Sequence, residues 1–75
     1  MAQPFLSIVI PAYNEEMRIA QTLNTVVDYV RGQGYSWEIV VADDGSQDRT
    51  AALVEAAARE NPDIRLVRLD HRGKG

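Results

Sequence analysis

Three short apolar segments alternate with two longer segments in which apolar residues recur every three or four positions. Residues 5–11 and 37–42 are rich in Val and Ile at consecutive positions, which is typical of strands buried on both faces of a parallel sheet. Residues 64–69 form a third predicted strand. Pro11 is expected to end the first strand, because proline cannot donate to the sheet ladder.

The two longer segments are predicted to be helices. Asn14 is expected to be the N-cap of the first, followed by two Glu that complement the helix dipole, and Gly32 or Gly34 is expected to end it. Ser46 is expected to cap a second helix from residue 47 to about residue 60. The apolar positions expected on these helices are Met17, Ala20, Leu23, Val26, Val27 and Val30, and then Leu53, Val54, Ala57 and Ala58.

The order β-α-β-α-β with short connections predicts the α/β class. Such crossovers are almost always right-handed, so we expect a Rossmann-like three-layer half-domain with a parallel sheet of order 3-2-1 and crossover helices. The first and most apolar strand would then lie at a sheet edge, where exposed apolar strands tend to aggregate. We therefore expect either a larger protein, of which this is the N-terminal part, or self-association through that edge.

Composition excludes several classes of protein. The 75 residues include no Cys and one His, which rules out disulfides and Cys-based zinc sites and disfavours a His-rich metal site. The net charge of −3 disfavours nucleic-acid binding through a basic surface. No apolar run approaches the ~20 residues of a spanning helix. A cytoplasmic location is expected, with any membrane association carried by regions outside these residues.

Three polar loops follow the three predicted strands, at residues 11–15, 42–46 and 70–75. Ligands of open parallel sheets bind at the carboxyl ends of the strands, so these loops are expected to converge on one site. No glycine precedes Gly32, which excludes the glycine-rich phosphate loops of dinucleotide-binding and P-loop proteins.

The side chains of these loops are suited to a nucleotide. The ring of Tyr13 can stack on a base, and the adjacent carboxylates of Asp43 and Asp44 can accept from a ribose hydroxyl or from backbone N–H groups. Arg72 and Lys74, next to the backbone freedom that Gly73 and Gly75 provide, can face a pyrophosphate. Each loop also has a plainer interpretation, as a helix cap, an Asp-rich turn or a solvated basic loop. It is their convergence that favours a nucleotide pocket.

The motifs of this chain resemble the opening of a known enzyme family. Residues 7–16 read Ser-Ile-Val-Ile-Pro-Ala-Tyr-Asn-Glu-Glu, residues 38–46 read Glu-Ile-Val-Val-Ala-Asp-Asp-Gly-Ser, and residues 73–75 read Gly-Lys-Gly. Together with Asp48 and Thr50, they resemble family 2 glycosyltransferases with the A-type fold. Residues 14–23 most resemble the branch that makes polyprenyl-phosphate sugars, such as dolichyl-phosphate glucose or mannose synthases.

The resemblance implies a set of residues around the nucleotide and donor sugar. These are Pro11, Ala12, Tyr13, Glu15, Ala42, Asp43, Asp44 and Lys74. Within the family, Asp44 would contact base or ribose, Asp43 would orient its loop, and Lys74 would lie where the third loop approaches the donor. His71 departs from the family pattern, which has Asn at that place, and is expected to be an ordinary loop residue.

The resemblance also implies a reaction. Residues 1–75 would be the incomplete nucleotide-sugar-binding portion of an inverting enzyme that moves a hexose from a UDP- or GDP-sugar to a polyprenyl phosphate. A divalent metal, Mn²⁺ or Mg²⁺, would bind an Asp-x-Asp motif beyond residue 75. No catalytic or metal-binding residue is therefore expected here, and the chain alone is predicted to be inactive.

Two other functions compete with this one. A stand-alone module of this length could bind nucleotides, or could act as an interaction domain, without catalysis. A phosphoacceptor receiver domain is also doubly wound, but its acidic pair follows the first strand, where this chain has Pro-Ala-Tyr-Asn at residues 11–14.

Overall fold

The computed structural model describes residues 5–34 and 36–69. Its elements are β1 (Phe5–Ala12), α1 (Ile19–Arg31), β2 (Ser36–Asp43), α2 (Thr50–Glu60) and β3 (Ile64–Arg68). All three strands are parallel and lie in the order β1-β2-β3, with β2 in the centre. This confirms the predicted β-α-β-α-β topology and the 3-2-1 order.

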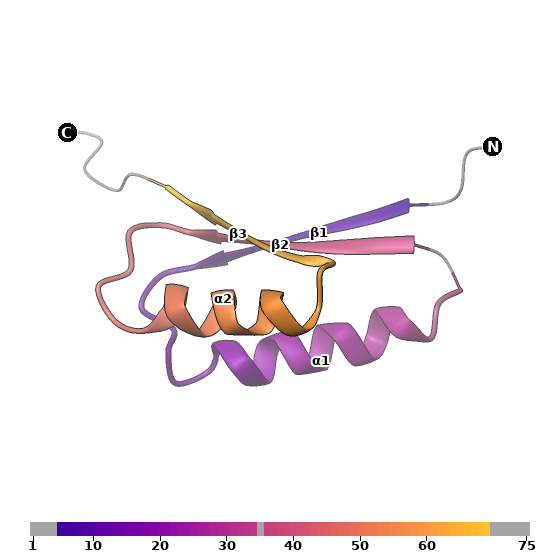
Figure 1. Ribbon diagram of the computed structural model, residues 1–75, viewed down its shortest axis with the longest axis horizontal. Helices are drawn as coiled ribbons and strands as arrows, with labels where there is room; N and C mark the ends of the chain where they lie inside the picture. Colours follow the sequence, from indigo (N-terminus) through magenta and orange to yellow (C-terminus); the bar gives the residue numbers. More distant parts are fainter. Residues whose placement is uncertain (1–4, 35, 70–75) are drawn as a thin grey trace.

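Both helices lie on the same face of the sheet (Figure 1). The chain advances across the sheet in one direction, from β1 to β3, so two crossovers of the usual hand place their helices on one side. The described residues thus form two layers, the sheet and one helix layer, of the three that we predicted. Neither helix in the described ranges is long and apolar enough to cross a membrane.

The core lies between the sheet and the two helices. The central strand contributes Ile39 and Val41, both fully buried, against Val54 of α2 and Leu23 of α1. The predicted apolar face of α1 was wrong at two positions, because Met17 is 87% exposed and Ala20 is also exposed. Ile19 is buried instead, since regular helix begins only at that residue.

The opposite face of the sheet is open. Phe5 and Val9 of β1 are each 61% exposed there. Between them in sequence, the Ser7 hydroxyl donates to Glu38 Oε2 at 2.8 Å, and Glu38 Oε1 lies 3.8 Å from Arg65 Nε. The open face is therefore apolar with one polar row across its middle.

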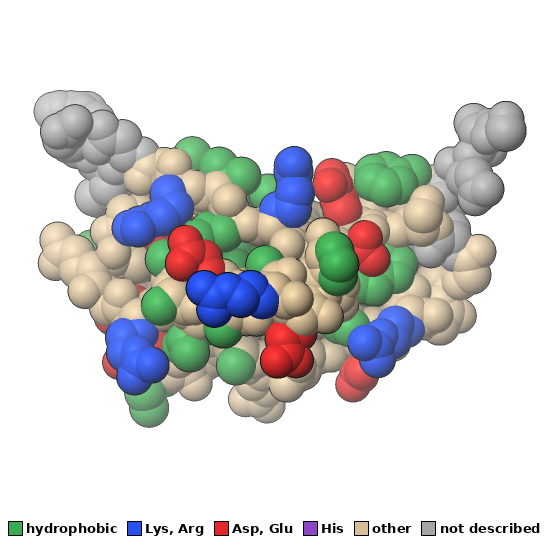
Figure 2. All heavy atoms as spheres, in the orientation of Figure 1, with side chains coloured by type: hydrophobic (Ala, Val, Ile, Leu, Met, Phe, Trp, Pro, Cys, Tyr) green, Lys and Arg blue, Asp and Glu red, His purple; other side chains and the backbone are tan. Residues whose placement is uncertain are grey.

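Charged side chains of both signs are interspersed on the side of the molecule seen in Figure 2. On the part of that side formed by the described residues, no broad basic patch of the kind that binds a nucleic-acid backbone is visible.

The strand β1 runs one residue past Pro11, which we expected to end it. The next carbonyl, that of Ala12, accepts a hydrogen bond from the backbone N–H of Asp44 at 2.8 Å. Because consecutive residues of a strand point their backbone groups to opposite sides, Pro11 faces the free edge of the sheet. Its missing N–H therefore costs no ladder bond.

Both predicted N-caps were wrong. The cap position of α1 is Arg18 rather than Asn14, and that of α2 is Arg49 rather than Ser46, and neither cap side chain bonds its own helix. The C-terminus of α1 is as predicted, because the helix ends before Gly32.

Candidate functional site

The carboxyl ends of the three strands are joined by backbone hydrogen bonds. Besides the bond from Asp44 to Ala12, the N–H of Leu69 donates to the carbonyl of Asp43 at 2.8 Å. The first two of the polar loops therefore start from fixed points side by side, at the edge predicted from sequence. The third loop begins at residue 70, outside the described residues.

From here on the first loop is taken to residue 16 and the second to residue 50. The first loop is held by side chains of the second. Three consecutive backbone N–H groups, those of Asn14, Glu15 and Glu16, donate to Ser46 Oγ at 2.8 Å, Thr50 Oγ1 at 2.7 Å and Asp48 Oδ2 at 3.1 Å, respectively. These groups lie at the start of the helical turn that leads into α1, where backbone donors lack partners within the helix. The second loop thus supplies the caps that α1 lacks in its own sequence.

The second loop is held in return by side chains of the first. The N–H of Gln47 donates to Asn14 Oδ1 at 2.8 Å, and the N–H of Arg49 donates to Glu16 Oε1 at 2.9 Å. Asn14 has φ 50°, in the left-handed region that Asn tolerates better than most residues. Each helix N-terminus is therefore capped by the other loop, and we call this arrangement the reciprocal cap; its side chains are Asn14, Glu16, Ser46, Asp48 and Thr50.

Asp43 lies fully buried beneath the reciprocal cap. Its carboxylate accepts from the hydroxyl of Ser46, from the backbone N–H of Ser46 at 3.3 Å, and pairs with Arg68 Nε at 3.3 Å. These partners offset the repulsion that two adjacent carboxylates, Asp43 and Asp44, would otherwise suffer. Both oxygens of the Asp43 carboxylate thus accept from Ser46 of the same loop, and the role of Asp43 in orienting that loop for a ligand stays a prediction.

The hydrogen bonds of the reciprocal cap shift the pKa of Asp48. Burial raises its pKa, but hydrogen bonds from the hydroxyl and backbone N–H of Thr50 and from the backbone N–H of Glu16 outweigh burial and hold the pKa below its ordinary value. Asp48 is therefore ionised at neutral pH, which suits a group that accepts from several donors.

The predicted site residues on the first two loops lie together at this edge. Pro11 is exposed and pairs in register with half-buried Ala42, and Ala12, which is buried, pairs with Asp43. Tyr13 is 45% exposed, immediately after the strand.

Glu15 and Asp44 are partly exposed at the same edge. The Glu15 carboxylate is a third exposed and accepts from Arg18 at 2.9 and 3.2 Å. A hollow of about 200 Å³ lies beside it, lined by Ile10, Pro11, Glu15, Arg18, Ile19 and Thr22. Lys74, the eighth predicted residue, lies outside the described residues, as does His71.

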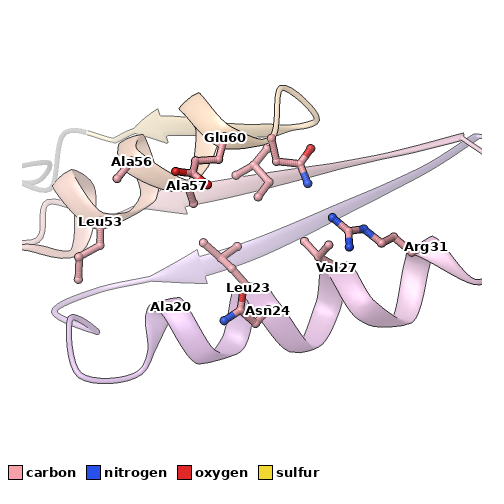
Figure 3. Close-up of a pocket in the computed structure, with 11 residues that line it drawn as sticks. Ala20, Leu23, Asn24, Val27, Arg31, Leu53, Ala56, Ala57 and Glu60 are labelled. Carbon is pink, nitrogen blue, oxygen red and sulfur yellow. The ribbon is translucent and has the colours of Figure 1, made fainter.

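A groove of about 390 Å³ lies elsewhere, between α1 and α2 (Figure 3). Leu23 and Val27 line it from α1, and Leu53 and Ala57 line it from α2. Asp43 and Asp44 take no part in it, so the groove and the strand-end loops are separate features.

The sequence analysis gave no role at the strand ends to Arg68, which pairs with Asp43, or to Thr50, which accepts from the Glu15 N–H. Arg68 lies opposite Asp43 in the register of β3 on β2, and the sequence carried no signal for that register. The spacing Ser46-x-Asp48-x-Thr50 was visible as a motif, but its hydrogen bonds run to a loop more than 30 residues away.

The carboxylates of the described residues do not suit a resident metal ion. No group of three or more His, Asp or Glu side chains gathers in the described ranges. Asp43 and Asp48 are also already engaged by hydroxyl, backbone and guanidinium donors.

Comparison with known proteins gives a consistent result. The family described as "Glycosyl transferase family 2" matches residues 7–75. The chain is 39% identical over 71 residues to a dolichyl-phosphate beta-glucosyltransferase of Trichomonas vaginalis, covering 88% of this chain and 22% of that protein. It is 38% identical over 79 residues to a dolichyl-phosphate beta-glucosyltransferase of Dictyostelium discoideum, covering 95% of this chain and 24% of the relative.

A bacterial relative has a different sugar in its name. The chain is 44% identical over 63 residues to an undecaprenyl-phosphate 4-deoxy-4-formamido-L-arabinose transferase of Shewanella sediminis, covering 84% of this chain and 19% of that protein. The chain thus spans about a fifth to a quarter of the length of these relatives.

Proposed function

This chain belongs to glycosyl transferase family 2, and we propose that it forms the nucleotide-sugar-binding part of a transferase that acts on a polyprenyl phosphate. The names of the relatives support the acceptor class, since they name dolichyl or undecaprenyl phosphate. Because the chain spans only about a fifth to a quarter of those relatives, the acceptor site and the reacting groups are assigned to the rest of the protein.

The observation that carries the proposal is the joining of the first two loops at one sheet edge. The bond between Asp44 N–H and the Ala12 carbonyl, 2.8 Å long, places partly exposed Tyr13 and Asp44 on neighbouring strand ends. The Tyr13 ring would pack against the base, and the Asp44 carboxylate would accept from a base N–H or a ribose hydroxyl. Glu15, on the same loop as Tyr13, would line the nucleotide, and Lys74 would approach the pyrophosphate.

The proposed reaction is an in-line displacement at the donor sugar. A phosphate oxygen of the acceptor would form a bond to the anomeric carbon of a UDP- or GDP-hexose while the bond to the nucleoside diphosphate breaks, which inverts that carbon. A divalent cation on the pyrophosphate would stabilise the leaving group. We place its ligands beyond residue 75, where the resemblance to the family puts the Asp-x-Asp motif.

Isothermal titration of the full-length protein with UDP and GDP, each with and without Mn²⁺, tests this proposal. We expect one nucleotide to bind and Asp44→Ala to weaken binding by about tenfold or more, since a hydrogen bond to a charged group is worth about 1.5–3 kcal/mol. Glu55→Ala, an exposed change on α2, is the matched control. Wild-type protein that binds neither nucleotide would remove the donor-site assignment.

The competing function is an interaction module without catalysis. It is favoured by the open face of the sheet, where Phe5 and Val9 are each 61% exposed. A defined oligomer that loses its assembly on Val9→Glu, together with absent nucleotide binding, would favour this function.

A further inference from the structure

We propose that Thr50 is a positioning residue, whose hydroxyl holds the Glu15 peptide in place for nucleotide binding. The proposal rests on the proposed function, because it concerns the same donor site. Thr50 is fully buried, so it would not contact the nucleotide itself. Its influence would pass through one backbone hydrogen bond.

The hydrogen bonds of Thr50 have a fixed direction. The Glu15 N–H can only donate, so the Thr50 oxygen accepts from it, at 2.7 Å. The single hydroxyl proton is then directed to Asp48 Oδ1, which also accepts from the Thr50 backbone N–H at 2.9 Å. Since the pKa of Asp48 is lowered by these bonds, its carboxylate stays ionised and accepts the hydroxyl proton, which leaves a lone pair of the Thr50 oxygen for the Glu15 N–H.

Glu15 is the residue from which the first loop turns into α1. Its carbonyl accepts from the N–H groups of both Arg18 and Ile19, each at 2.8 Å, so its peptide starts the helical turn. Its carboxylate is held by Arg18 at 2.9 Å. A shift of the Glu15 backbone would therefore move a carboxylate that lines the proposed site.

The neighbouring bonds make the effect of Thr50 local. Asn14 N–H is held by Ser46 Oγ at 2.8 Å, and Glu16 N–H by Asp48 Oδ2 at 3.1 Å. Loss of the Thr50 hydroxyl would thus leave the loop attached on both sides of Glu15. Valine has nearly the same shape as threonine, so Thr50→Val removes the hydroxyl without opening a cavity.

The test compares four variants of the full-length protein by titration with the nucleotide that the wild type binds, and by the KM of the donor sugar. Thr50→Val removes the bonds of the hydroxyl to both Glu15 and Asp48, and is expected to raise both the Kd and the KM by about tenfold, with a smaller change in kcat. Thr50→Ser keeps the hydroxyl and should stay within about threefold of wild type. Val54→Ala, at a fully buried position on the same helix, is a control for loss of stability alone.

Asp48→Asn provides a second route if Thr50→Val does not fold. With its amide nitrogen toward Thr50, Asn would lose the bonds from both the hydroxyl and the N–H of Thr50. With the nitrogen toward Glu16, it would lose the bond that holds the next N–H group of the first loop. We expect it to weaken nucleotide binding as Thr50→Val does.

The outcomes separate this proposal from the proposed function. Wild-type protein that binds neither UDP nor GDP overturns both. Wild-type binding that is unchanged in Thr50→Val and Asp48→Asn overturns the positioning role alone. So does equal weakening by Val54→Ala, because loss of stability would then account for the effect, and so does failure of Thr50→Ser to restore binding.

Discussion

Replacing Asp43 by alanine should be among the most destabilising changes at the strand ends. Asp43 is fully buried and accepts from the Ser46 hydroxyl, the Ser46 N–H and the Arg68 guanidinium. Asp43→Ala leaves the buried hydroxyl of Ser46 without its acceptor, which costs about 1–3 kcal/mol. The Arg68 side chain is 56% exposed and can turn to water, so losing its partner adds about 1 kcal/mol or less. The expected loss is therefore about 3 kcal/mol.

The local free energy of opening is the quantity to measure, because the full-length protein extends beyond this chain in our proposal. Hydrogen exchange of peptides from β2 and from residues 43–50, followed at increasing urea concentration, reports it directly. Arg68→Ala should cost about 1 kcal/mol by the same measurement, and the exposed control Glu55→Ala should cost almost nothing. If the local free energy of opening were the same in Asp43→Ala as in Glu55→Ala, the reasoning would be refuted, because the buried carboxylate would then contribute nothing to the stability of the strand ends.

Three further predictions concern stability. Val54→Ala removes two methyl groups from a fully buried site and should lower the free energy of unfolding by about 2–3 kcal/mol in urea denaturation, and a loss below about 1 kcal/mol would contradict the packing described. Gly34→Ala should cost about 1–2 kcal/mol in the same assay, through backbone strain alone, because φ is +79° and an added Cβ meets no atom within 4 Å. The lowered pKa of Asp48 means that its stabilising contribution is complete above the ordinary pKa of about 3.9 and is lost as pH falls through the lower folded-state value. The urea midpoint should therefore fall between pH 6 and pH 3, and less steeply in Asp48→Asn; equal slopes would contradict the role of this carboxylate.

The strands and their order in the sheet were predictable from sequence, because they follow from local patterns and short connections. Consecutive Val and Ile in residues 37–42 predicted the central strand, and short crossovers predicted the parallel order, both of which the structure has. The C-terminus of α1 was also predictable from a local signal, because Gly32 directly follows the helix.

The helix N-termini were not predictable, because their partners are distant in sequence. Asn14 and Ser46 have the residue types of N-caps, yet each binds the other loop, across 32 or 33 positions. The error at Met17 has the same origin. Residues 15–18 form a turn ahead of the helix, so Met17 does not belong to it. The buried face of α1 begins at Ile19.

The candidate site was predictable as a location and less so as a structure. The rule that ligands bind at the carboxyl ends of parallel strands put Tyr13, Asp43 and Asp44 at one edge, as the structure does. It did not reveal that Asp43 would be fully buried beneath Ser46 and paired with Arg68. That depends on the register of β3, which local patterns do not encode.

Protection from hydrogen exchange on adding nucleotide to the full-length protein tests the donor site most directly. The account predicts that UDP or GDP slows exchange in residues 11–16 and 42–48, while the α1–α2 groove around Leu23 and Ala57 is unchanged. Protection confined to that groove, or absent from both strand-end loops although the nucleotide binds, would contradict it.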